Sequence, residues 1–474
     1  MQNTENTAPK TPAAPTHRFD PEILREYDIR GTIGDTLKKT DCYFIGRSFG
    51  TALRRRGGKT AVIGFDGRES SPAFCIEVMR GLNDCGIDVE NIGLGPSPMV
   101  YFAMKSRGLD AAVVVTGSHS PAAYNGVKMA LQTAPFYGKD VQNLGQLAAA
   151  GDFESGAGST RDVDVQDAYV DRLLQDYTGP KNLTVAWDNG NGAAGEIIRR
   201  LTKKLPGKHI LLFDKIDGTF PNHHPDPTVA KNLADLQNAV RDNHCDAGVA
   251  FDGDADRFGA VDADGNILWA DILMAIYAAE VLKNQPGATI IADVKSSRVL
   301  FDEITRLGGK PVMWNTGHSL IKAKMIECRS PLAGELAGHI CFGDRYYGFD
   351  DGPYCAIRLL NMLGKPLSSL TAHLPKMHNT PEVRFHVPAE RKFKIAPEIL
   401  HRLRSVNDKD ASVNDIDGVR MTNPAGWWLI RASNTEDMLT VRAESFSPQG
   451  LAQLKQQLVD QLFLSGISSP FEKD

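Results

Sequence analysis

The chain has 474 residues, of which 42% are hydrophobic and 23% charged, a balance typical of a globular protein with several domains. Its formal net charge of -5 argues against a nucleic-acid-binding protein, because no excess of lysine and arginine is available to neutralise phosphates. No stretch approaches the roughly 18 consecutive apolar residues of a membrane span, so we expect no membrane association. The seven cysteines are scattered and never spaced as C-x-x-C, which favours free thiols in a cytoplasmic protein.

The first part of the chain predicts a tail followed by a repeated α/β unit. Residues 1–16 are polar and proline-rich, and we expect them to be disordered. Residues 60–93, 183–214 and 288–315 then share one pattern, in which an apolar strand ends in aspartate and is followed by a turn, an amphipathic helix and a second strand. The three aspartates are Asp66, Asp188 and Asp293. Strands that alternate with helices predict βαβ units and parallel sheets.

Each of the three units is followed by another apolar strand that runs into a polar loop. The loops contain TGSHSP at 116–121, DGDADR at 252–257 and GELAGH at 334–339. If the units are structurally equivalent, these loops lie at equivalent carboxyl ends of strands, where open α/β sheets bind ligands. After about residue 378 the alternation ends; residues 380–388 and 426–445 predict strands and 447–465 a last helix, which indicates a smaller α+β domain.

In the first polar loop, Ser118 and His119 stand side by side. The motif is not the G-x-S-x-G of a serine hydrolase, and neighbouring side chains on extended backbone point to opposite faces. His119 therefore cannot be assumed to be the base of Ser118. The hydroxyl could instead carry a phosphate, whose charge would fit against a cation; a plain turn is the alternative.

The second polar loop has aspartates at every second position. On extended backbone the carboxylates of Asp252, Asp254 and Asp256 point to one side and can converge on a cation. Three oxygen ligands with positions to spare suit Mg2+. An EF-hand is excluded, because its glycine and glutamate positions hold Arg257 and Ala263. A solvated acidic turn is the alternative.

A fourth polar stretch lies near the end of the chain. The planar guanidinium of Arg431 matches a phosphate, and Ser433, Asn434 and Thr435 supply short donors within one turn. This combination predicts an anion site, with a polar hairpin turn as the alternative.

Two glycine-rich stretches are less specific. Glu335 and His339 lie in a flexible loop suited to hydrogen bonds with sugar hydroxyls. Gly190, Gly192 and Gly195 form a G-x-G-x-x-G turn between a predicted strand and helix, the sequence context of a dinucleotide site. A nicotinamide-dependent dehydrogenase would, however, leave the three polar loops without a role.

The motifs TGSHSP, DGDADR, GELAGH and RASNTED, in that order, resemble those of the α-D-phosphohexomutase superfamily, and the bacterial phosphomannomutase/phosphoglucomutase branch is the most similar. REYDIRG, GLGPSP, YNGVK, FPNHHPDP and DGVR extend the resemblance over nearly the whole chain. It implies a heart-shaped enzyme with three related mixed-sheet α/β domains and a C-terminal α+β domain around a central cleft. The expected boundaries are 17–162, 163–266, 267–378 and 379–474.

The resemblance also implies the reaction and the roles of the residues. The enzyme would interconvert the 1- and 6-phosphates of mannose or glucose through a phosphoserine and a hexose 1,6-bisphosphate, which also acts as activator. Ser118 would carry the phosphoryl group beside one Mg2+ per active site, and the other implied groups fall into four sets. They are the metal ligands Asp252, Asp254 and Asp256 together with Ser118; the sugar-binding Glu335 and His339; the phosphate-binding Arg431, Ser433, Asn434 and Thr435; and Tyr27, Arg30, His119, Lys128, Arg257 and Lys295 as further groups of the site.

Three positions bear on the substrate. Leu336 stands where the phosphoglucosamine branch has glutamine, so the mannose/glucose branch is favoured and phosphoglucosamine mutase is the alternative. Ala337 replaces a usual serine, and Asp437 replaces a usual proline. We expect hexose phosphates as partners, with no nucleic acid and no membrane. The sequence leaves the oligomeric state and the choice between mannose and glucose open.

Overall fold

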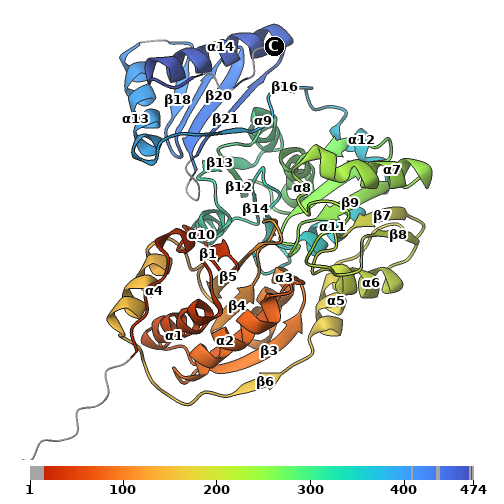
Figure 1. Ribbon diagram of the computed structural model, residues 1–474. Coiled ribbons are helices and arrows are strands. Elements are labelled where there is room, and N and C mark those ends of the chain that lie inside the picture. The colour runs from red at the N-terminus through yellow and green to blue at the C-terminus, as the bar shows by residue number, and fades with distance from the viewer. Residues whose placement is uncertain (1–14, 407–408, 434–437, 469–470, 472–474) are drawn as a thin grey trace, which may run out of the picture.

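The computed structural model describes residues 15–406, 409–433, 438–468 and 471, and its strands form four sheets in chain order (Figure 1). We call the parts built on these sheets domains I to IV. In Figure 1 domain I is red and orange, domain II green, domain III teal and central, and domain IV blue. Residues 1–14 of the expected tail lie outside the described residues. The fold class inferred from the sequence is confirmed.

Domain I has a six-stranded sheet with the order β1-β5-β4-β2-β3-β6. Its strands are β1 (Ile29–Thr32), β2 (Thr60–Phe65), β3 (Asp88–Leu94), β4 (Ala111–Val115), β5 (Tyr124–Leu131) and β6 (Thr160–Asp162). Its helices are α1 (Lys39–Arg55), α2 (Ser71–Asn83), α3 (Ser97–Arg107) and α4 (Lys139–Ala150), after a short 3-10 turn at Pro21–Ile23. All five side chains of β4 are buried, which explains its unbroken AAVVV run.

Domains II and III are smaller versions of the same arrangement. Domain II contains α5 (Gln166–Gln175), β7 (Thr184–Asp188), α6 (Gly195–Lys204), β8 (Lys208–Leu212), a 3-10 turn at Ala230–Leu233, α7 (Ala234–Asp242), β9 (Ala247–Phe251), β10 (Phe258–Asp262) and β11 (Ile267–Leu268). Domain III contains α8 (Ala270–Asn284), β12 (Thr289–Asp293), α9 (Arg298–Arg306), β13 (Lys310–Trp314), α10 (His318–Cys328), β14 (Leu332–Gly334), β15 (Ile340–Phe342), α11 (Gly352–Leu360) and α12 (Leu367–Thr371).

The first three sheets share one four-stranded unit. The orders β3-β2-β4-β5, β8-β7-β9-β10 and β13-β12-β14-β15 have the same directions, parallel between the first three strands and antiparallel to the last. The three polar loops join the last two strands of each unit. We call them the serine loop (116–123), the aspartate loop (252–257) and the glutamate loop (335–339). They therefore occupy equivalent positions, as the repeat predicts.

Domain IV is built differently. Its strands are β16 (His378–Asn379), β17 (Val383–His386), β18 (Ser412–Asn414), β19 (Val419–Asn423), β20 (Gly426–Ala432) and β21 (Met438–Ser445), and all their pairings are antiparallel. Helices α13 (Ala389–Ser405) and α14 (Pro448–Leu464) contribute the core residues Ile395, Ile399, Leu454, Leu458 and Leu462. The sequence did not predict α13, because Pro397 stands inside it and proline usually ends a helix.

Buried polar contacts join domain IV to domain III. The Arg420 guanidinium donates to the carbonyls of Val294 (2.6 Å) and Ser296 (2.8 Å), and Arg442 donates to the carbonyl of Lys295 (2.8 Å). Glu444 accepts from the Ser297 hydroxyl at 2.9 Å. These bonds hold the segment after β12, which carries Lys295, against the sheet of domain IV.

Two further findings concern the cysteines and the helices of the described residues. All seven cysteines lie among the described residues and are free. Within those same parts of the chain, none of the helices combines the length and the apolar character needed to cross a bilayer.

Candidate active site

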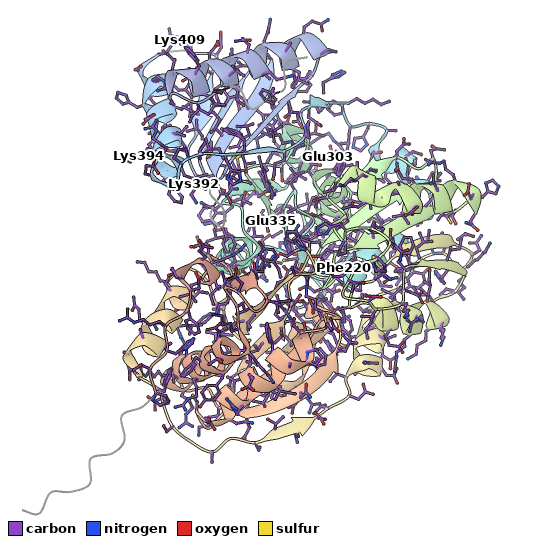
Figure 2. The ribbon with its side chains drawn as sticks, in the orientation of Figure 1. Phe220, Glu303, Glu335, Lys392, Lys394 and Lys409 are labelled. Carbon is purple, nitrogen blue, oxygen red and sulfur yellow. The ribbon has the colours of Figure 1, made fainter. Side chains whose placement is uncertain are left out.

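One cavity lies where the four domains meet, and each domain contributes side chains to it. Figure 2 labels Glu335 at this central position. The lining residues are Arg25, Tyr27, Asp28, Arg30, Ser118, His119, Ser120, Lys128, Arg257, Lys295, Thr316, Gly317, His318, Glu335, Ala337, His339, Arg384, Arg431, Ser433 and Thr440. Apart from the aspartates, every site residue predicted from the sequence and described by the structure is among them. Asn434, Thr435 and the Asp437 departure lie outside the described residues.

The serine loop is fastened from below by Asp66, the residue that follows β2. Its carboxylate accepts from the Thr116 hydroxyl at 2.8 Å and from the Gly117 N–H at 3.1 Å. The Thr116 hydroxyl oxygen in turn accepts from the Ser118 N–H at 2.8 Å. Hydrogen bonds within the protein therefore fix the backbone around Ser118 without a bound ligand.

Arg68 fixes the same loop from its other side. This guanidinium is 2% exposed and donates to the carbonyl oxygens of Ser118 (2.8 Å), Ser120 (2.6 Å), Pro121 (2.8 Å) and Tyr124 (2.9 Å). Its ion pair with Asp66, at 3.1 Å, joins the two supports. The five donors of a planar guanidinium can reach four carbonyls spread along the loop, whereas a lysine has three donors on one atom.

Ser118 lies in the left-handed region of backbone conformation, with φ of 50°. Its hydroxyl donates to Asp252 Oδ2 at 2.9 Å, and its Oγ also lies 3.2 Å from His119 Nδ1. The expectation that Ser118 and His119 point to opposite faces was wrong, because it assumed extended backbone. Both side chains reach the same cavity.

The three carboxylates of the aspartate loop converge beneath Ser118. Their ligand oxygens lie within 4.8 Å of one another, and all three side chains are buried. The backbone is not extended as assumed from the sequence, since Ala255 has a φ of 58° and bends the loop. The convergence predicted from the alternate spacing is nevertheless present.

The surroundings of these carboxylates fit a hard divalent cation. Asp254 Oδ1 and Asp256 Oδ1 are buried and have no hydrogen-bond partner among the described residues. Asp256 Oδ1 has a longer contact with His339 Nδ1, at 3.5 Å, and burying carboxylate oxygens without hydrogen bonds is costly, so this all-oxygen group calls for positive charge. Oxygen-only ligands are those that Mg2+ prefers. Burial, with Asp254 and Asp256 close by, raises the pKa of Asp252 well above its usual value.

Lys128 on β5 supplies one positive charge to this group. Its ammonium donates to Asp254 Oδ2 at 2.7 Å and to Asp256 Oδ2 at 2.6 Å. Burial alone would lower the pKa of Lys128, but the two carboxylates hold it well above its usual value. Burial likewise would raise the pKa of Asp256, which Lys128 and His339 lower to about 2.

Arginines complete the positive surroundings of Ser118. Arg257 directs its Nε to His339 Nε2 at 3.1 Å, and its backbone N–H donates to Asp252 Oδ1 at 3.1 Å. Arg30 donates to the Ser120 hydroxyl at 2.9 Å. Burial, followed by the charges of Arg257 and Arg30, lowers the pKa of His119 well below its usual value. His119 is therefore neutral near pH 7.

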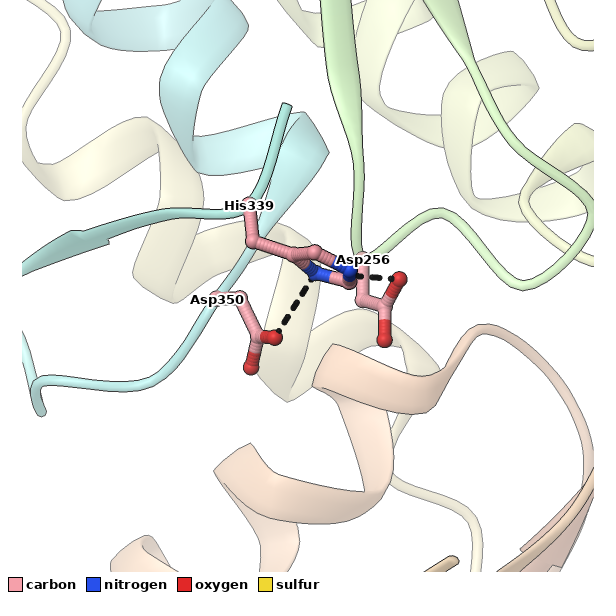
Figure 3. Close-up of side chains that lie close together, drawn as sticks. All are labelled: Asp256, His339 and Asp350. Carbon is pink, nitrogen blue, oxygen red and sulfur yellow. Dashed lines mark ion pairs between the residues drawn. The ribbon is translucent and has the colours of Figure 1, made fainter. Parts of the chain in front are cut away.

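The glutamate loop joins the aspartate loop through His339. His339 Nδ1 lies 3.0 Å from Asp350 Oδ2 and 3.5 Å from Asp256 Oδ1 (Figure 3). Glu335 Oε1 accepts from the Gly317 N–H at 2.6 Å, and burial is the main cause that raises the pKa of Glu335. These contacts orient both predicted sugar-binding side chains toward the cavity.

Domain IV reaches the cavity through Arg431. Its Nε donates to Asp417 at 3.0 Å, and the same carboxylate accepts from the Thr316 N–H of domain III at 2.9 Å. Lys295 forms an ion pair with Glu382 at 2.9 Å. The predicted phosphate-binding residues Arg431 and Ser433 therefore line the cavity from domain IV, whereas Ser118 lines it from domain I.

The G-x-G-x-x-G turn supports the aspartate loop. The Ala193 N–H donates to the Gly253 carbonyl at 2.8 Å. A Cβ at Gly192 would lie 2.9 Å from that carbonyl oxygen, and one at Gly195 only 2.0 Å from the Asp214 carbonyl oxygen. Both glycines are thus explained by close packing against protein backbone, and the dehydrogenase alternative is not favoured.

Sequence reasoning missed several contributors to the site. Asp350 is fully buried and meets Lys322 (2.8 Å), His318 (3.4 Å) and His339 (3.0 Å), so it holds two histidines of the cavity. The adjacent aspartates in FDDG were a possible signal. Arg68, in DGRES directly after a strand-ending aspartate, was another.

Four family models match the chain in succession. Their descriptions are phosphoglucomutase/phosphomannomutase, alpha/beta/alpha domain I at residues 21–154, domain II at 167–265, domain III at 269–378, and C-terminal domain at 382–461. Together they cover most of the sequence, and their order follows the four sheets.

Curated relatives match over nearly their full length. A phosphomannomutase/phosphoglucomutase of Pseudomonas aeruginosa is 40% identical over 95% of this chain and 97% of its own. A phosphoglucomutase of Neisseria gonorrhoeae is 38% identical over 90% of this chain and 93% of its own.

Solved structures give the same result. A phosphoglucomutase/phosphomannomutase family protein of Burkholderia thailandensis is 40% identical, with a TM-score of 0.90 over 96% of this chain and 100% of its own. An N-acetylphosphoglucosamine mutase variant of Aspergillus fumigatus, solved with glucose 1,6-bisphosphate, shares the fold, with a TM-score of 0.61 at 14% identity over 95% of this chain and 97% of its own.

Proposed function

The chain belongs to the phosphoglucomutase/phosphomannomutase family, and we propose that it interconverts the 1- and 6-phosphates of mannose or glucose by passing a phosphoryl group through Ser118. It is accordingly an isomerase. The observation that carries the proposal is the contact of Ser118 Oγ with Asp252, at 2.9 Å, inside a cavity lined by all four domains. The matched relatives bear both substrate names, which favours a hexose over a glucosamine phosphate.

In the resting enzyme Ser118 would carry a phosphate. The ester brings up to two negative charges, which Lys128 and Arg257 can offset. The oxygens of Asp252, Asp254 and Asp256, with the phosphate on Ser118, would hold Mg2+, which supplies further charge neutralisation on the transferring group.

Transfer then requires mainly alignment and charge neutralisation. The free hydroxyl of a hexose monophosphate attacks phosphorus, the bond from phosphorus to Ser118 Oγ breaks, and a hexose 1,6-bisphosphate forms. The proton of the attacking hydroxyl ends on Ser118 Oγ. His119 can hold this proton between the two oxygens, because it is neutral and its Nδ1 lies 3.2 Å from Oγ.

The return step uses the same groups in reverse. The bisphosphate turns in the cavity, its other phosphate returns to Ser118, and the isomeric monophosphate leaves. Throughout, Arg431 and Ser433, with Asn434 and Thr435 of the same stretch, would hold whichever phosphate is not reacting. Glu335 and His339 would bind the sugar hydroxyls, while Tyr27, Arg30 and Lys295 bind the rest of the substrate.

A coupled assay tests the activity directly. With Mg2+ and a trace of glucose 1,6-bisphosphate, we expect turnover of glucose 1-phosphate and mannose 1-phosphate and much less of glucosamine 1-phosphate. Negligible turnover of all three would overturn the proposal.

The mass of the intact chain tests the phosphoserine. After incubation with the bisphosphate, one added phosphate is expected on the native chain and none on Ser118→Ala. A matched control is Ser106→Ala, on the exposed end of α3, which should keep both the phosphate and the activity. A chain that binds hexose phosphates but never gains mass would be a sugar-phosphate sensor.

A further inference from the structure

A second cavity lies between domains I and III, beside the catalytic one. Its volume is about 220 Å3, against about 210 Å3 for the catalytic cavity. It is bordered by α3, by the end of β5 with the turn that follows it, by α10 and by the segment between β15 and α11. Tyr27, Lys128 and His318 line both cavities, so the two are separated by single side chains.

The walls of this second cavity are largely aromatic and thioether groups. The ring of Phe349 lies 5.7 Å from that of Tyr101 and is stacked with that of Tyr347 at 5.8 Å, centroid to centroid. Met104 and Met325 add flexible apolar surface. A planar ring fits such walls better than a hydrated sugar does.

The charges at the cavity all have one sign. Lys105, Lys128 and Lys322 line it, and no carboxylate does among the residues that the structure describes. This is unusual in a chain with a net charge of -5. The apolar groove between α8 and α12 shows the contrast, because Glu280 and Glu303 line it together with two lysines.

Two of these lysines are available to a ligand in different ways. Lys105 is half-buried and donates to the Gln132 carbonyl, a neutral partner, and no carboxylate among the described residues forms an ion pair with it. Lys322 donates to Asp350 Oδ1 at 2.8 Å and lies over the Tyr101 ring at 5.3 Å. An anion placed between the two lysines would form an ion pair with Lys105. It would compete with Asp350 for the ammonium of Lys322.

We propose that this cavity binds a small aromatic anion, with its ring among Tyr101, Tyr347 and Phe349 and its charge between Lys105 and Lys322. A bound anion lowers turnover, because it weakens the ion pair between Lys322 and Asp350. Asp350 then no longer holds His318 and His339 in fixed positions. The proposed binding is argued from the residues of this cavity alone. The proposed effect on turnover also rests on the proposed function.

A fluorescent arylsulfonate, 8-anilinonaphthalene-1-sulfonate, is a suitable probe for the full-length chain with Mg2+. Ile326 lines the cavity and is 59% exposed, so its replacement leaves the core intact. Ile326→Asp and Ile326→Lys remove the same apolar side chain and introduce charges of opposite sign. We expect the first to weaken binding and the second to strengthen it, by about threefold each at low salt.

Ile76 on α2 provides the matched control. It is 58% exposed and does not line the cavity. Ile76→Asp and Ile76→Lys should leave the affinity of the probe unchanged. The site is overturned if the Ile326 pair does not move the affinity in opposite directions, or if the Ile76 pair moves it as far.

Competition identifies the cavity and the class of ligand. Saturating glucose 1-phosphate should not displace the probe, and displacement would place it in the catalytic cavity and overturn the proposal. Toluenesulfonate should displace it at lower concentration than methanesulfonate. Equal potency of the two would overturn the aromatic requirement.

Activity measurements separate this proposal from the function on which it partly rests. The probe should lower kcat for glucose 1-phosphate with little change in KM, and the Ile326 variants should keep the basal rate. Binding without any loss of turnover would overturn the link through Asp350. Charge-dependent binding by a chain with no mutase activity would overturn the proposed function and leave the site intact.

Discussion

The serine loop of domain I and the aspartate loop of domain II follow equivalent strands but present different chemical groups. The first presents one hydroxyl on left-handed backbone, fastened by Asp66 and Arg68. The second presents three buried carboxylates, supported by the turn at Ala193. They meet at a single hydrogen bond, from Ser118 to Asp252.

The difference shows how a repeated fold builds an asymmetric site. The shared strand order places the two loops at corresponding edges, and the packing of the domains turns those edges toward each other. The residues of the two loops differ, so under the proposed function one unit supplies the serine that would carry phosphate and the other supplies the carboxylates that would hold Mg2+. Each side can be altered alone.

The largest effect should come from breaking the contact between the loops. Asp252→Asn keeps the shape but removes the negative charge beside Ser118, and we expect kcat to fall by about 100-fold or more with the fold retained. Turnover at saturating Mg2+ is the measurement. Asp235→Asn, on the surface of α7, is the control. An Asp252→Asn enzyme with native turnover would contradict the assignment.

A smaller effect is expected from loosening the serine loop while the aspartate loop stays intact. Arg68→Lys keeps the charge but loses most of the bonds to four carbonyls, which should cost about 1–3 kcal/mol of unfolding free energy and lower kcat about tenfold. Urea unfolding and the Mg2+ concentration for half-maximal rate are measured together. The Mg2+ concentration for half-maximal rate should not change. A change would show that the serine loop and the aspartate loop are coupled. Arg241→Lys, on α7, is the surface control.

The converse change loosens the aspartate loop. A Cβ at Gly192 would press on the carbonyl oxygens of Gly253 (2.9 Å) and Asp252 (3.1 Å). Gly192→Ala should therefore raise the Mg2+ concentration for half-maximal rate about tenfold, the low end of the range typical of groups that support metal ligands. Gly364→Ala, whose Cβ would meet nothing within 4 Å, is the control. Lower stability with an unchanged Mg2+ response would refute this support role.

The smallest effect concerns the third equivalent loop. Ala337 lines the catalytic cavity, and Ala337→Ser adds one hydroxyl there. A neutral hydrogen bond contributes about 1 kcal/mol, so we expect kcat/KM to change by no more than about fivefold. The ratio of kcat/KM for mannose 1-phosphate and glucose 1-phosphate is the measurement. An unchanged ratio together with unchanged kcat/KM values would show that this position does not contact the sugar.

Much of the fold could be predicted because its signals are local. Apolar runs that end at Asp66, Asp188 and Asp293 identified the repeated strands, and the residue types in each loop identified the chemistry. Helix α13 was missed because Pro397 contradicts local helix propensity, and packing of Ile395 and Ile399 into the core outweighs it.

The sequence predicted residues that line the central cavity but not how they are arranged there. The left-handed backbone of Ser118, which brings His119 to the same side, depends on bonds from Arg68, 50 residues earlier. The role of Asp350 depends on three partners from two separate segments. Neither the backbone conformation of Ser118 nor the contacts of Asp350 can be predicted from the residues next to them in the sequence.

The sequence by itself therefore determined which chemical groups the loops carry and in which order the strands present them. Only the tertiary structure decided that Ser118 meets Asp252, 134 residues away, and that Lys128 lies between two carboxylates. The reason is physical: local propensities act over a few neighbouring residues, whereas these contacts are set by the burial of whole domain faces against one another.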